Sequence, residues 1–178
     1  MPETLTPAAE RIAQSFEAAV AARRSFAHPY PYHLLDGVFP ADVSDALAEL
    51  PFAPPVLNGV SGKRELHNDQ RSYFDATGVA RFPIMGAVAE ALQSRRVVAG
   101  IAEAFAAPID DTFLRLEYAQ DVDGFWLQPH TDLGVKKFTC LIYLSDGPGH
   151  DKLGTDIYET PEKHFGVSPF KRGGAMVF

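Results

Sequence analysis

Cysteine, long apolar runs and positive charge are what this sequence has least of. Its 178 residues include one cysteine, Cys140, which excludes an internal disulfide and a cysteine-rich zinc site. No stretch reaches the roughly 18 consecutive apolar residues of a membrane span. Acidic residues outnumber basic ones by 23 to 16, for a net charge of −7. This balance argues against nucleic-acid binding and against a polybasic membrane surface.

The first residues, MPETLTPAAERIAQSFEAAV, carry acids near their start and no long apolar core, which predicts neither a signal peptide nor a transit peptide. Together with the single cysteine, this favours a reducing cytoplasm. Hydrophobic residues make up 46% of the chain and charged residues 22%, which is typical of a soluble globular protein. We therefore expect one domain over residues 1–178.

The N-terminal part, residues 1–107, reads as mainly helical. Apolar residues recur at helical spacing from Pro7 to Arg24, with Thr6 as a plausible N-cap. A strong helical stretch over 83–105 is expected to break near 93–96. Between the helices, a polar excursion near 53–78 is rich in proline, glycine and asparagine, and loops of that length are often functional.

The C-terminal part, residues 108–178, is typical of a β-structure. Alternating or β-rich segments are separated by turn residues, and the expected strands are Thr112–Tyr118, Gly124–Asp132, Lys137–Ser145, Thr155–Glu159 and Gly173–Phe178. Helices followed by strands indicate an α+β class, with the N-terminal helices packed against a β-sandwich.

His130 and Asp132 form the candidate metal-binding pair. On a strand, residues two apart point to the same face, so an imidazole nitrogen and a carboxylate oxygen would converge. That is two-thirds of the facial triad of two histidines and one carboxylate that binds Fe(II). The spacing alone is weak, because His67 and Asp69 repeat it inside the polar excursion. We interpret that second pair as a solvated loop.

The residues around His130 resemble the Fe(II)/2-oxoglutarate oxygenases, in particular the prolyl-hydroxylase-like branch. The stretch LRLEYAQDVDGFWLQPHTDLGVKKFTCLIYLS has a strand ending in Tyr118, a turn at Gly124, the H-x-D pair and a T-x-L-x-Y-L-like strand. LGTDIYE and KRGGAMVF are similar to later strands of that family, and YHLLDGVFPADVSDAL to its first strand and helix. The resemblance implies a double-stranded β-helix, or jelly-roll, core.

The resemblance implies roles for the matching residues. His130 and Asp132 would bind Fe(II), with 2-oxoglutarate as co-substrate. Tyr143 would donate a hydrogen bond to the distal carboxylate of 2-oxoglutarate, and Tyr118 matches a second pocket tyrosine. Thr139 shares a strand face with Tyr143 and would line the same pocket. The implied reaction is hydroxylation of a small-molecule or peptidyl substrate.

The family's third ligand is a histidine beyond the G-x-x-v-x-F strand, followed by a basic residue that pairs with 2-oxoglutarate. The sequence ends at Phe178, before both positions. We expect a truncation, because a final apolar strand would otherwise leave an open sheet edge. His150 and His164 precede that strand and are interpreted as surface loop histidines. The chain as given is therefore expected to hold metal weakly or not at all.

Two other classes stay open at this stage. The chain could be a non-catalytic jelly-roll module that binds a partner or a sugar. It could also be a cupin-like metalloprotein without 2-oxoglutarate, although cupins usually place a second histidine where Asp132 stands. Residues 58–75 are a candidate lid. Arg71 and its neighbours could line a substrate entrance, but a solvated loop is the favoured interpretation.

Overall fold

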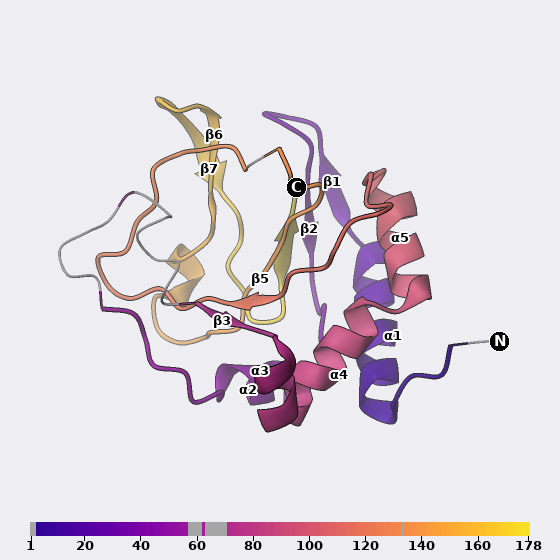
Figure 1. The fold of residues 1–178 in the computed structure, drawn as a ribbon. Helices are drawn as coiled ribbons and strands as arrows, with labels where there is room; N and C mark the ends of the chain where they lie inside the picture. The colour runs from indigo at the N-terminus through magenta and orange to yellow at the C-terminus, as the bar shows by residue number, and fades with distance from the viewer. Residues whose placement is uncertain (1–2, 57–61, 63–70, 133) are drawn as a thin grey trace.

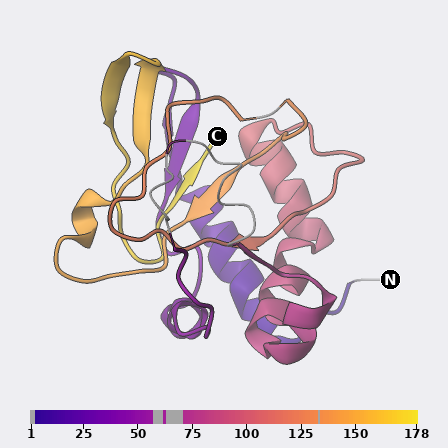
Figure 2. The same ribbon diagram turned by 60° about the vertical axis from the view of Figure 1, so that its left-hand side comes forward.

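The computed structural model describes residues 3–56, 62, 71–132 and 134–178, and it is mixed α/β. Its described strands form one four-stranded sheet and two two-stranded sheets. Figures 1 and 2 show the larger helices on one side of the four-stranded sheet and a β-hairpin on the other. The jelly-roll core stays a prediction.

The first helix follows the expected rules closely. α1 (Pro7–Ala21) has proline in its first turn, and the Thr6 hydroxyl accepts a hydrogen bond from the Ala9 amide at 3.3 Å. The expected break in the later helical stretch is confirmed at Gln93–Ser94. The remaining helices are α2 (Ala41–Ala48), α3 (Ala76–Arg81), α4 (Pro83–Leu92) and α5 (Arg95–Phe105).

The four-stranded sheet joins the two ends of the chain. Its strands, in spatial order, are β1 (Arg24–Phe26), β2 (Tyr32–Leu35), β8 (Ala175–Val177) and β5 (Cys140–Ile142). All neighbouring pairs are antiparallel.

The final strand is not at an edge, which corrects the expected open edge. Val177 of β8 pairs with His33 of β2 on one side and with Cys140 of β5 on the other. Backbone hydrogen bonds of 2.9 and 3.0 Å continue this pairing from Thr139 to Phe178. Because β8 enters between two other strands, both of its edges are hydrogen-bonded within the sheet.

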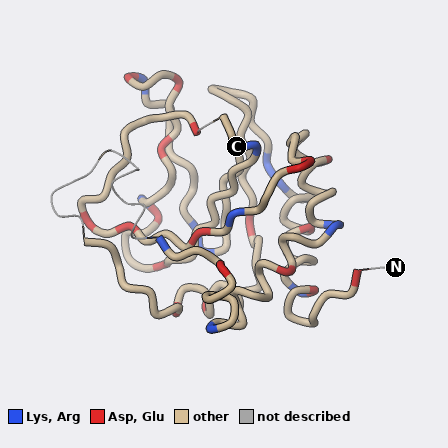
Figure 3. Tube along the Cα trace, in the orientation of Figure 1, with Lys and Arg blue, Asp and Glu red and all other residues tan. Residues whose placement is uncertain are grey.

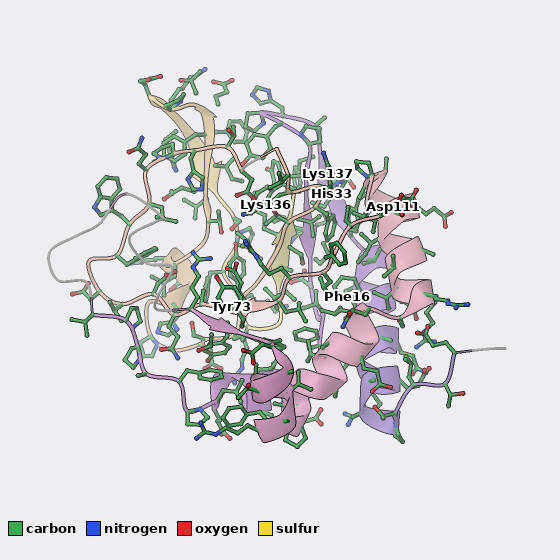
Figure 4. All side chains as sticks on the ribbon, in the orientation of Figure 1. Phe16, His33, Tyr73, Asp111, Lys136 and Lys137 are labelled. Carbon is green, nitrogen blue, oxygen red and sulfur yellow. The ribbon has the colours of Figure 1, made fainter. Side chains whose placement is uncertain are left out.

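One face of the sheet, called here the helix face, is closed by helices. The sheet residues that point to this face are part of the main hydrophobic core or pack against it: Cys140, Ile142, Ala175 and Val177. Phe16 of α1 belongs to the same core (Figure 4). The core's fully buried members include Ile12, Val38, Leu47, Met85, Val97 and Val177. Burial of this apolar surface is the main force holding the helices to the sheet.

The opposite face, called here the hairpin face, is covered only in part. The hairpin consists of β6 (Asp156–Thr160) and β7 (Lys163–Val167), and Ile157 of β6 joins Tyr32, Leu34 and Met176 in a second buried cluster. The sequence predicted β6 but took β7 for a loop. Leu141 on β5 is opposite Met176 and stays 37% exposed, so the hairpin leaves the β5 side of this face open.

Two predicted strands are wrong or too long. Of Thr112–Tyr118, only β4 (Glu117–Tyr118) forms, paired with β3 (Ser72–Tyr73). Gly124–Asp132 is not a strand in the structure. Apart from an isolated bridge between Leu127 and Gly62, its residues have no assigned β-pairing. Pro129 lies within this segment and has no amide hydrogen to donate to a ladder.

The candidate lid at 58–75 falls mostly outside the described residues, and so do His67 and Asp69. Arg71, at its described end, forms an ion pair with Glu117 of β4, with both side chains largely buried. Along the described chain, acidic and basic residues are interspersed over helices and loops alike (Figure 3). No helix of the described part is both long and apolar enough to cross a membrane.

Candidate functional site

The Asp132 carboxylate is anchored to the start of the β5 region. The Thr139 hydroxyl donates to its Oδ2 at 2.7 Å, and the ammonium of Lys136, which is labelled in Figure 4, donates to its Oδ1 at 2.6 Å. The Asp132 and Lys136 side chains are only 18% and 20% exposed. Because Thr139 is paired to Phe178 through the backbone, the carboxylate is held at the open β5 edge of the sheet.

His130 is exposed and is held by its own chain segment. Its Nδ1 lies 2.8 Å from the Gln128 carbonyl oxygen. A carbonyl oxygen can only accept, so this hydrogen bond puts a proton on Nδ1 and, in the neutral ring, leaves the Nε2 lone pair for another partner. Metal-binding histidines are commonly oriented by such a bond.

The strand geometry expected for the pair is wrong, since Gly124–Asp132 has no regular β-structure. Three separate contacts orient the donors instead. His130 is fixed through the Gln128 carbonyl, and Asp132 through Thr139 and Lys136. The hydrogen bond from Thr139 to Asp132 nevertheless joins the H-x-D segment to the residue that precedes β5.

Tyr143 lies on the hairpin face, two positions along from Leu141 and four from Thr139. Its hydroxyl is 2.8 Å from the Thr155 hydroxyl and 2.6 Å from the Ser168 hydroxyl. The Phe170 ring packs on it with a centroid distance of 4.6 Å. The structure thus places Thr139 and Tyr143 on one side of the sheet, because alternate residues of a strand share a face.

Tyr118 does not join them. It packs against the helix-side core, with its ring 5.3 Å from that of Phe52. Its role as a second pocket tyrosine stays a prediction. Cys140, also on the helix face, offers no thiolate at neutral pH, because burial raises the pKa of its thiol to about 12.

The other histidines form separate arrangements. His164 is on β7 rather than in a loop, and its Nε2 is 2.8 Å from Oδ1 of Asp156 on β6. His150 begins a short 3₁₀-helix, His150–Lys152. Among the described residues, no group of three histidine, cysteine, aspartate or glutamate side chains is placed to hold a metal ion.

Two contacts bear on whether Asp132 and His130 could bind a divalent cation. Asp132 already holds a positive charge, the Lys136 ammonium, against one of its oxygens. His130 presents a ring nitrogen that the Gln128 contact does not use. A metal ion bound by Oδ1 of Asp132 would have to replace Lys136, so the ion pair competes directly with metal binding.

Sequence reasoning missed three residues of this region: Lys136, Thr155 and Ser168. Lys136 is four residues from Asp132, but only the turn at 134–135 brings the two side chains together. Serine and threonine are too common for their positions to be a signal. Only the hairpin, which brings Thr155 to Ser168, shows that they contact Tyr143.

Comparison of the chain with protein-family models, with curated proteins and with solved structures gives no match.

Proposed function

We propose that this chain is an Fe(II)- and 2-oxoglutarate-dependent oxygenase of the prolyl-hydroxylase-like kind, with a jelly-roll core and a cytoplasmic location. One observation carries the proposal. The hydrogen bond from Thr139 to Asp132 joins the H-x-D segment to the strand that bears Tyr143. Ligand pair, strand and tyrosine are the three parts of the family pattern, and this contact links Asp132 of the pair to the segment that carries Tyr143.

The residues have separate roles in this proposal. His130, through Nε2, and Asp132 would hold the iron, with Thr139 and Gln128 fixing their orientation. Tyr143 would direct its hydroxyl at the co-substrate, and the apolar Leu141 would exclude water beside it. Bound iron with 2-oxoglutarate and O₂ would supply the oxidising power to hydroxylate a C–H bond.

The substrate class stays broad: a small molecule or a peptide. The net charge of −7 argues against polyanions, because the protein's field would repel them.

The Lys136–Asp132 ion pair favours a second candidate, a non-catalytic binding module. An ammonium on the carboxylate satisfies Asp132 without any metal. In that case the hairpin face would bind its partner directly, and the His130 ring would be a surface histidine.

Metal titration separates the two candidates. Under anaerobic conditions, wild-type protein is titrated with Fe(II), and with Mn(II) followed by electron paramagnetic resonance. We expect weak but saturable binding that His130→Ala and Asp132→Asn abolish. The matched controls are His164→Ala and Asp156→Asn, which alter a histidine–aspartate contact on the hairpin and should leave binding unchanged.

Succinate formation from 2-oxoglutarate is then measured with and without candidate substrates. Absence of saturable metal binding in the wild type, or equal binding in all four variants, would overturn the oxygenase proposal and favour the binding module. Metal binding without any succinate would point instead to a cupin-like protein.

A further inference from the structure

Three hydroxyl groups from distant parts of the sequence meet beside the open edge of the sheet. Tyr143 follows β5, Thr155 precedes β6 and Ser168 follows β7. The phenol oxygen is 2.6 Å from Ser168 Oγ and 2.8 Å from Thr155 Oγ1. Ser168 is only 2% exposed, whereas Tyr143 and Thr155 are partly exposed.

The backbone of the hairpin base holds this hydroxyl cluster (Tyr143, Thr155 and Ser168) together. The Ser168 amide donates to the Thr155 carbonyl at 2.9 Å, and the Thr155 amide donates to Ser168 Oγ at 2.8 Å. Gly154 permits this approach, since a Cβ there would lie 1.7 Å from the Ser168 carbonyl oxygen. Only glycine fits so close to another backbone.

The hydrogen bonds of the hydroxyl cluster can be counted. Three hydroxyls carry three protons, and the two hydroxyl–hydroxyl contacts use two of them. The contact from the Thr155 amide uses none, because Ser168 Oγ accepts there. One hydroxyl proton is therefore left for an acceptor outside the cluster.

Burial decides which residue offers that proton. Ser168 is enclosed, and a buried hydroxyl proton without an acceptor is costly, so Ser168 donates to Tyr143. The remaining proton then belongs to Tyr143 or Thr155, the two partly exposed members. The Phe170 ring packs on Tyr143 and restrains the orientation of the phenol ring.

We propose that Ser168 and Thr155 are positioning residues for Tyr143, which orient the hydroxyl cluster so that one O–H is offered to a carboxylate of the co-substrate. This proposal rests on the proposed function for the identity of the ligand. Beyond that function, it assigns Ser168 and Thr155 a role that is exerted through Tyr143. That role explains why both residues lie at the base of the hairpin.

The test measures 2-oxoglutarate binding to the Mn(II)-loaded protein by calorimetry, without turnover. Tyr143→Phe should weaken binding by about tenfold or more, because a hydrogen bond to a charged group is lost. Ser168→Ala and Thr155→Val should each weaken it by about three- to tenfold. Thr155→Ser keeps the hydroxyl and should bind like the wild type. Thr160→Val, the same change on an exposed β6 position, is the control.

A second measurement follows the geometry without any ligand. The Cζ carbon resonance of Tyr143 is assigned by its loss in Tyr143→Phe, and it reports the hydrogen bonding of the phenol. It should shift in Ser168→Ala and in Thr155→Val but not in Thr160→Val. If Ser168→Ala does not fold, the comparison of Thr155→Val with Thr155→Ser tests the proposal, both by 2-oxoglutarate binding and by the Tyr143 resonance.

The outcomes separate the two proposals. Normal 2-oxoglutarate binding in both Ser168→Ala and Thr155→Val, or an unmoved Tyr143 resonance in both, overturns the positioning role and leaves the proposed function intact. A wild type that binds Mn(II) but not 2-oxoglutarate overturns the oxygenase function and the carboxylate-binding role together, even if the Tyr143 resonance shifts as expected.

Discussion

The two faces of the four-stranded sheet differ in what they contact. The helix face is apolar and packs against α1, α4 and α5, and its residues Ala175 and Val177 are almost fully buried. The hairpin face mixes hydroxyls with apolar residues and leaves Leu141 partly exposed. The same short strands serve both, because consecutive side chains alternate between faces. The helix face supplies stability, and the hairpin face carries Thr139 and Tyr143 of the proposed site.

The largest expected effect is a difference in the stability that is lost when a large apolar side chain is truncated on each side of the sheet. Ile12→Ala, in the fully buried core under the helix face, should lower the free energy of unfolding by about 2–5 kcal/mol, because it leaves a cavity. Leu141→Ala on the hairpin face should cost less than about 1.5 kcal/mol, since that side chain is already partly in water. Urea denaturation of both variants measures the difference, and equal losses would contradict the contrast.

A smaller effect tests the N-terminal cap of α1, the first helix on the helix face. The Thr6 hydroxyl caps α1 and also donates to Glu90 of α4 at 2.6 Å. Thr6→Ala should therefore cost about 1 kcal/mol of stability. Thr4→Ala, an exposed threonine two residues earlier, is the control and should change the unfolding midpoint little. A midpoint for Thr6→Ala that matches that control would show that the cap adds nothing here.

On the hairpin face, removing the competing ammonium should strengthen metal binding. Lys136→Met removes the ammonium that a metal ion at Oδ1 of Asp132 would have to displace. We expect Mn(II) to bind about three- to tenfold more tightly, because the displaced ion pair has a modest energy. Lys137→Met removes the neighbouring ammonium, which instead donates to the Gly134 carbonyl, and should bind as the wild type does. Weaker Mn(II) binding in Lys136→Met would mean that Lys136 supports the site rather than blocking it.

The smallest effect is a pH dependence on the helix face. Burial, and then the positive charge of Arg23, lower the pKa of His33 below its usual 6.5. The unfolded chain therefore binds a proton at this residue before the folded chain does, so this contribution to stability is complete above about pH 6.5 and is lost as the pH falls below it. Between about pH 7.5 and 5, the wild type should lose more stability than His33→Gln. Parallel loss in both proteins would exclude His33 as a source.

Periodicity, capping and alternation predicted several helices and strands of the fold. The start of α1, the break between α4 and α5, and the strands β6 and β8 were visible in the residues alone, because local preferences and burial agree there. Gly124–Asp132 shows where this fails, since alternation suggested a strand but Pro129 and the lack of partners left an irregular segment. β7 was missed for the opposite reason: its partner β6, rather than its own composition, makes it a strand.

The candidate site divides in the same way. His130, Asp132, Thr139 and Tyr143 could be chosen from spacing and resemblance, because their chemistry is carried by residue type. Lys136, Thr155 and Ser168 could not, since their importance lies in contacts made across turns and across a hairpin.

By itself the sequence determined the first helix, the break in the 83–105 helical stretch and a candidate ligand pair, because these depend on residue type and on neighbours a few positions away. Only the tertiary structure decided that β8 lies inside the sheet and that Asp132 contacts both Thr139 and Lys136. It also decided that the hydroxyls of Tyr143, Thr155 and Ser168 contact one another and leave one O–H for an outside acceptor. Those outcomes depend on which distant segments pack together, and that is settled by burial over the whole fold.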